Sequence, residues 1–264
     1  VSIKFKSYED TIPKLLKVIK LNEELKKHAK IVLKPRVRNE NSVNTKVELV
    51  EAVLKFCVEN KNPETEIFIA EGADGADTLE LFEKLGYKKL AEKYNTGLID
   101  LNYTEVEDVE ISGFLKFNKI FYPKILLEGF VISMPMLSTD YGSTIAASLE
   151  NMLGAFPARY YKGFFSTEKT KIKNWPVTYS IHDIARCKMP DFVLIDASDK
   201  GLILAGKPVD MDKQAAKILG IDVRAVKHLK LIEESMFKDA ELTKRREAAT
   251  KEREIMAVAS QNMT

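Results

Sequence analysis

Residues 130–154, FVISMPMLSTDYGSTIAASLENMLG, decide the fold. They begin with an apolar run typical of a buried strand, continue through a polar loop and end in a helical pattern. In α/β proteins a ligand site often forms where a loop leaves the carboxyl end of a strand and the next helix points its amino end at the ligand. The stretch therefore predicts an α/β fold with a functional site in the loop at residues 138–144.

Apolar strands and amphipathic helices alternate before this stretch. Strands are expected at residues 1–6, 30–34, 65–70 and 97–101, and helices at 8–28, 47–58, 79–85 and 88–94. This order predicts right-handed crossovers and parallel strand pairing. Residues 106–111 and 120–122 are expected to add an antiparallel pair to the sheet, before a short helix at 124–128.

Further elements follow the opening stretch. Strands are expected at residues 191–196 and 201–205, and helices at 178–188, 208–219, 224–237 and, rich in charge, 239–258. The prediction is a three-layer α/β fold with a largely parallel mixed sheet and helices on both faces. It forms one domain over residues 1–237, with a small lobe from 103–129 and 155–177, followed by a charged helical tail at 238–264.

Composition argues against several kinds of partner, membrane segment and metal site. Lys plus Arg total 41 against 39 Asp plus Glu, a balance that argues against nucleic acid as a partner. No apolar run approaches the ~18 residues that a membrane helix needs, and residues 1–10 lack the apolar core of a signal peptide. Cys57 and Cys187 are too few for an iron–sulfur cluster, and the three histidines have no metal-ligand neighbours. We expect a cytoplasmic protein without a membrane partner, without a metal site and without an iron–sulfur cluster on its own cysteines; any other cofactor is unknown.

Three polar loops are candidate sites. The loop at 138–144 could hold phosphate or carboxylate; alternatively, Ser143 or Thr144 only caps a helix. The loop at 71–77, EGADGAD, could bind a cation or a sugar hydroxyl; alternatively, it is a turn in which Asp77 caps a helix. The cations in residues 34–39, KPRVRN, could clamp an anion, or they could form a solvated basic loop.

Other residues carry weaker signals. Asp196 ends a strand, whereas Asp210 and Asp212 lie in a first helical turn, where acids are common for dipole reasons. His182 is either a ligand-binding residue or a buried core histidine. Residues 155–177 mix aromatic and basic side chains, which favours a lid or packing loop over a surface for single-stranded nucleic acid.

The order of several motifs resembles a family known as domain of unknown function 362. The matching pieces are IVLKP (31–35), IFIAEG (67–72), FVISMP (130–135), ENMLG (150–154), PDFVLID (190–196) and ILAGKPVDMDKQAAKILGID (203–222). The family's usual Lys-Thr-His corresponds here to Ser138-Thr139-Asp140, and Arg36 replaces an Asn. Lys207 replaces an Asp, and residues 197–200 replace a longer loop. Many relatives carry or accompany iron–sulfur clusters, so the resemblance implies an iron–sulfur protein as a possible partner.

The expected site is a cleft at the strand ends. Its predicted ligand-binding residues are Lys34, Arg36, Glu71, Ser138, Thr139 and His182, and its predicted catalytic residues are Asp140, Asp196 and Asp212. One hypothesis is an enzyme, or a former enzyme, that acts on a small anionic metabolite. The alternative is a non-catalytic binding or assembly module that works with an iron–sulfur partner.

Overall fold

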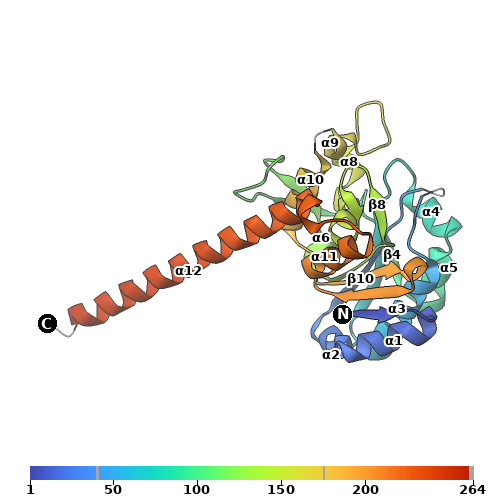
Figure 1. Ribbon diagram of the computed structural model, residues 1–264, viewed down its shortest axis with the longest axis horizontal. Helices are drawn as coiled ribbons and strands as arrows, with labels where there is room; N and C mark the ends of the chain where they lie inside the picture. Colours follow the sequence, from blue (N-terminus) through green and yellow to red (C-terminus); the bar gives the residue numbers. More distant parts are fainter. Residues whose placement is uncertain (40–41, 175, 262–264) are drawn as a thin grey trace.

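A computed structural model describes residues 1–39, 42–174 and 176–261. Trp175, part of the predicted aromatic segment, and residues 262–264 of the predicted tail lie outside the described residues. The main sheet has seven strands in the order β1-β11-β10-β7-β2-β3-β4 (Figure 1). These strands are β1 (Ser2–Lys4), β2 (Lys30–Pro35), β3 (Glu66–Glu71), β4 (Gly97–Asp100), β7 (Phe130–Met134), β10 (Phe192–Ala197) and β11 (Leu202–Gly206).

The five strands from β4 to β10 are parallel, whereas β11 is antiparallel to both β10 and β1. Helices cover both faces, so the predicted three-layer α/β fold with a largely parallel mixed sheet is confirmed. The longer helices are α1 (Tyr8–Val18), α3 (Val47–Asn60), α10 (Val177–Cys187), α11 (Pro208–Ile218) and α12 (Lys227–Gln261). The shorter ones are α2 (Leu21–Glu24), α4 (Thr78–Lys84), α5 (Tyr87–Tyr94), α6 (Lys124–Glu128), α7 (Ser148–Asn151), α8 (Ala158–Tyr161) and α9 (Thr170–Lys173).

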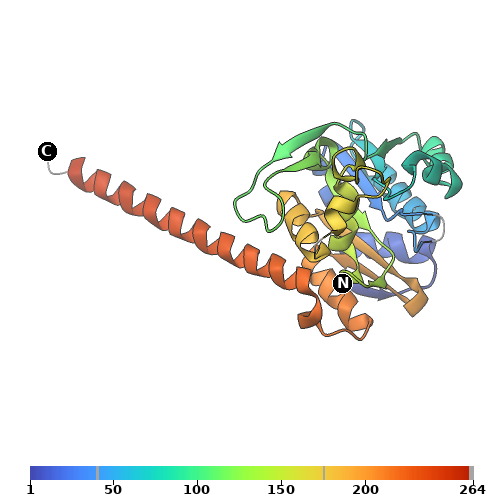
Figure 2. The ribbon, with the colours of Figure 1, turned by 90° about the horizontal axis from the view of Figure 1, so that it is seen from above.

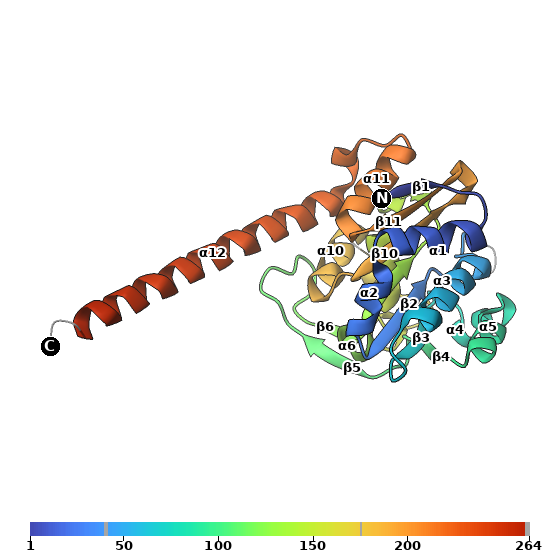
Figure 3. The same cartoon turned by 90° about the horizontal axis from the view of Figure 1, so that it is seen from below.

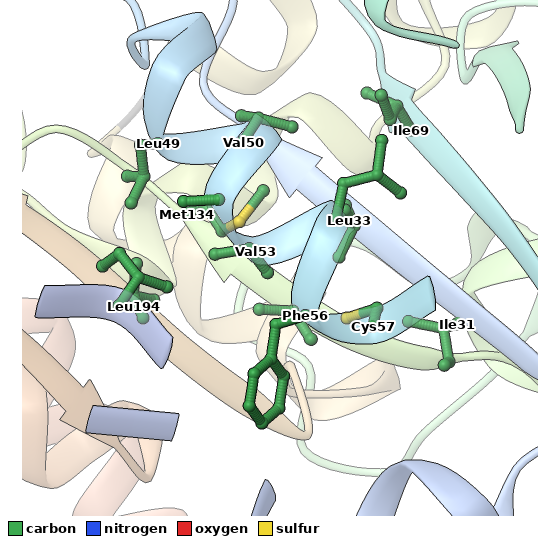
Figure 4. Packing of buried hydrophobic residues seen from close by; sticks show 14 of the residues in the cluster. Ile31, Leu33, Leu49, Val50, Val53, Phe56, Cys57, Ile69, Met134 and Leu194 are labelled. Atoms are coloured by element: carbon green, nitrogen blue, oxygen red, sulfur yellow. The ribbon is translucent and has the colours of Figure 1, made fainter. Parts of the chain in front are cut away.

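Helices α1 and α3 cover one face of the sheet (Figure 3). Their side chains and those of this face form one apolar cluster. Ile31 and Leu33 of β2 meet Val53, Phe56 and other residues of α3 there (Figure 4). Val32 points to the opposite face, where it joins a second cluster with Phe156. Parallel strands buried on both faces read as continuous apolar runs, which is why the sequence predicts them well.

The predicted helix at residues 8–28 is interrupted. Lys20 adopts a left-handed conformation with φ 58°, and the chain turns there from α1 into α2. A single α-helix was therefore the wrong prediction for this segment.

Two further features of the structure differ from the sequence predictions. β5 (Val106–Val109) and β6 (Ile120–Pro123) pair antiparallel as expected, but they form a separate two-stranded sheet. Residues 224–237 and 239–258 were expected as two helices, whereas α12 is one helix of 35 residues that projects from the domain (Figures 1 and 2).

The stretch after β7 contains a hairpin rather than a plain loop. β8 (Ser138–Asp140) pairs with β9 (Thr144–Ala146). Asp140 Oδ1 accepts hydrogen bonds from Gly142 N at 3.0 Å and from Ser143 N at 2.9 Å, which closes the turn. Ser143 and Thr144 therefore do not cap a helix. The next helix, α7, begins only at Ser148.

Candidate functional site

The order of the strands places a crevice beside β2. From β2 the chain moves to β3 and β4 on one side, and it later returns to add β7 and β10 on the other. The loops after β2 and β7 therefore diverge at a topological switch point, where α/β sheets bind ligands. A cavity of about 580 Å³ lies over the strand ends, and it is lined by Arg36, Arg38, Glu71, Gly72, Asp74, Asp140, Tyr141, Glu150, Gly154, Glu168, Lys169 and Lys173, among others.

A buried ion pair lies at the floor of this cavity. Lys34 Nζ is 2.9 Å from Glu71 Oε2, and the two side chains are 0% and 3% exposed. Lys34 Nζ also donates to the carbonyl of Asn151 at 2.6 Å, and Glu71 Oε1 accepts from Gly72 N at 2.8 Å. Since both charges are paired and hydrogen-bonded, the pair ties the end of β2 to the end of β3.

Lys169 covers the same floor from the segment between α8 and α9. Its Nζ donates to the carbonyls of Gly72 at 2.7 Å and Gly154 at 3.2 Å. Burial lowers the pKa of Lys169 to about 8, although nearby Glu71 acts in the opposite direction. Asp74 accepts a hydrogen bond from the backbone N–H of Lys169 at 2.7 Å and pairs with Lys173 at 2.6 Å. These contacts fasten the segment over the cavity.

Arg36 is the cation in the wall after β2. Its Nη1 donates to Ser138 Oγ at 2.9 Å and approaches the carbonyl of Met136 at 3.5 Å. Its Nε has no hydrogen-bond partner among the described residues, and none of their carboxylates pairs with the guanidinium. Arg36 is 6% exposed, and burial lowers its pKa. A buried guanidinium without a carboxylate is suited to an anionic ligand.

Arg38 and Glu150 form the adjoining wall. Arg38 Nη2 contacts Glu150 Oε1, and Arg38 Nη1 lies 3.7 Å from Asp140 Oδ2. Burial raises the pKa of Glu150, although Arg38 and Arg36 act in the opposite direction. Burial would also raise the pKa of Asp140, but hydrogen bonds from Ser143 and the charge of Arg38 bring it below its usual value.

Some predicted site residues meet at the cavity. Arg36, Glu71 and Asp140 line it. Lys34 lies beneath the floor in its ion pair with Glu71, and Ser138 holds the guanidinium of Arg36.

The other predicted site residues lie elsewhere. Thr139 is exposed on β8. Asp196 accepts a hydrogen bond from Tyr8 OH at 2.6 Å on the α1 side of the sheet. Asp212 accepts from Ser148 N at 2.9 Å and from Leu149 N at 3.0 Å, so it caps α7. His182 bonds Ser235 Oγ at 2.8 Å, between α10 and α12. The expected convergence of Asp140, Asp196 and Asp212 does not occur.

Asp77 takes the helix-capping alternative. Its Oδ1 accepts a hydrogen bond from Glu80 N at 2.9 Å, at the start of α4. Of the acids in residues 71–77, it is Glu71 and Asp74 that turn toward the cavity.

Three cavity residues were not among the predicted site residues. Arg38 lies two residues after Arg36 in the basic stretch, and Glu150 begins the ENMLG motif, so each belongs to a recognisable segment of the sequence. Lys169 is one of several lysines in the aromatic segment, and no local pattern distinguishes it.

Among the described residues, no three His, Cys, Asp or Glu side chains gather closely enough to hold a metal ion. None of the helices in that part of the chain combines the length and the apolarity needed to cross a bilayer.

Comparison with solved structures supports the fold. The lactate racemase apoprotein from Thermoanaerobacterium thermosaccharolyticum is similar with a TM-score of 0.54 and 14% sequence identity. The match covers 82% of this chain but only 56% of that one, so this chain corresponds to a little over half of that protein. At this identity the likeness shows a shared fold alone.

Sequence comparison identifies the family. No curated protein matches the chain. The family model of domain of unknown function 362 matches residues 31–226, which run from β2 to the residue before α12 and include every wall of the cavity. The chain therefore belongs to the domain of unknown function 362 family.

Proposed function

We propose that this protein binds a small organic anion in the cavity over β2, β3 and β7, as an enzyme-like domain. The observation that carries this proposal is Arg36: a buried guanidinium that faces the cavity without a carboxylate partner among the described residues. Leaving such a cation unpaired is costly, and an anion would stabilise it.

The other charges are consistent with this ligand. Lys34 is neutralised by Glu71, Lys173 by Asp74, and Arg38 by Glu150. Arg36 and Lys169, whose Nζ donates to backbone carbonyls, therefore remain as cations that a ligand would meet. Arg38 lies beside Arg36 at the half-buried rim. The cavity volume of about 580 Å³ is within the range of small-molecule sites.

Thermal denaturation with a panel of small carboxylates, phosphate and sulfate tests the proposal. A ligand at 100 times its Kd stabilises a folded protein by about 2.7 kcal/mol. We expect at least one anion to raise the Tm of the wild type and of Arg224→Met, an exposed control whose partner is Asp222. Arg36→Met should abolish the effect. No stabilisation by any anion, or equal stabilisation of Arg36→Met, contradicts the proposal.

A second candidate is an assembly module that works with an iron–sulfur protein partner. The observation that favours it is α12, which extends from the domain and offers surface for a partner (Figure 2). Loss of partner capture on removal of residues 239–264, with anion binding intact, would favour this role. The free thiols Cys57 and Cys187 support a reducing compartment, and we propose the cytoplasm.

A further inference from the structure

Two unpaired polar atoms lie in adjoining walls of the cavity. Arg36 Nε and Glu150 Oε2 have no hydrogen-bond partner within the described part of the chain, and their residues are 6% and 2% exposed. Both residues line the cavity. The other atoms of this kind belong to residues outside the lining: Thr96, Arg186 and His228.

The hydrogen bonds of Arg36 define which edge of the guanidinium is available. Within the described residues, both hydrogen bonds of the side chain come from Nη1, to Ser138 and to the carbonyl of Met136. The edge formed by Nε and Nη2 therefore offers two parallel N–H donors. This is the geometry that binds the two oxygens of a carboxylate.

Glu150 offers the complementary group. Arg38 holds its Oε1, so Oε2 is the oxygen left to accept a hydrogen bond from a ligand. Glu150 raises the pKa of Arg36 against the larger lowering by burial, so the two charged groups interact. Both residues line the same cavity, where one small molecule could meet both groups.

We infer that the ligand is a compact 2-hydroxy carboxylate, whose carboxylate binds the Nε–Nη2 edge of Arg36 and whose hydroxyl donates to Glu150 Oε2. This inference rests on the proposed function and specifies its substrate class. The hydroxyl is favoured over an ammonium group because Arg38 already pairs with the charge of Glu150, so a neutral donor suffices for the free oxygen. It is favoured over hydrogen because an analogue without a donor leaves the buried oxygen of Glu150 unpaired.

Isothermal titration calorimetry of the full chain tests this directly. Three ligands of one carbon skeleton are compared: malate with its hydroxyl, succinate without it, and aspartate with an ammonium group. Glycolate, acetate and glycine form a smaller matched series, and inorganic phosphate tests a non-planar anion. We expect the hydroxy acid of at least one series to bind about tenfold or more tightly than its two counterparts, and more tightly than phosphate.

Variants assign the preference to Glu150. Glu150→Gln should reduce the preference for the hydroxyl to about twofold, whereas Arg36→Met should abolish binding of every carboxylate. Glu128→Gln is the matched control, because that carboxylate is also paired with a cation, Lys30, but lies outside the cavity. It should keep the wild-type preference. The wild-type comparison of malate with succinate needs no variant, so it decides even if Glu150→Gln does not fold.

The outcomes separate the two claims. Carboxylates that bind without a preference for the hydroxyl overturn the inference and leave the proposed function standing. A preference for aspartate, glycine or phosphate also overturns it. Absence of binding by every anion contradicts the proposed function and the inference together.

Discussion

Adding one methyl group at Gly154 should strongly lower the free energy of unfolding. A Cβ at this residue would overlap Glu71 Oε1 and would lie 2.8 Å from both Glu71 Cδ and Lys34 Nζ. These atoms form the buried ion pair of the cavity floor, so Gly154→Ala must push Glu71 away from Lys34. Because breaking a buried pair costs about 3–5 kcal/mol, we expect a loss of this order in the free energy of unfolding. That is a large part of the roughly 5–15 kcal/mol that stabilises a typical protein.

Urea unfolding measures this loss through the transition midpoint and slope. Gly220→Ala is the matched control, since a Cβ there meets no atom within 4 Å. Its φ of +71° limits the expected cost to about 1–2 kcal/mol. Combining Gly154→Ala with Glu71→Ala should cost less than the sum of the two, because the second change removes the obstacle. A Gly154→Ala protein within about 1 kcal/mol of the control, or strictly additive effects, refutes the reasoning.

Three further predictions concern buried groups outside this contact. Burial lowers the pKa of Lys169 from 10.5 to about 8, so the unfolded chain binds more protons between these pH values and stability should rise with pH there. Lys169→Met should remove that rise, about 3 kcal/mol in total, and urea titrations from pH 7.5 to 10.5 check it. Burial raises the pKa of Asp212 from 3.8 to about 6. The proton held by its carboxyl group therefore contributes to the free energy of unfolding fully below pH 3.8, and this contribution is lost as the pH rises through 6. Asp212→Asn should flatten the pH dependence of urea unfolding over this window. Phe156→Ala should cost about 3–5 kcal/mol because the ring is fully buried, whereas Phe164→Ala, at an exposed loop position, should change stability by less than about 0.5 kcal/mol; thermal and urea unfolding of both distinguish them.

The predictability of this fold follows from where its strands lie. β7 is buried on both faces and is apolar except for Ser133, so its place in the sequence is plain. The polar ends of β2 and β3 also mark the edge at which the cavity forms, because parallel strands bring their carboxyl ends to one side. For this reason the sequence points to Arg36 and Glu71, and both line the cavity.

The remaining features depend on contacts between distant segments. Asp212 caps a helix that begins 64 residues earlier, and Arg38 reaches Glu150 across 112 residues. Neither pairing leaves a local pattern. The β8–β9 hairpin has only three residues in each strand, too few for alternation to be recognised.

The position of β7 has a consequence for synthesis of the chain. β2 comes early, but its neighbour β7 ends only at Met134, and β1 pairs with β11, which ends at Gly206. At about 5–20 residues per second, a ribosome takes roughly 10–40 s to make the chain between β1 and β11. During that interval the amino-terminal segments have open edges, which are a hazard for aggregation. The first strand is therefore the last to find its place in the sheet.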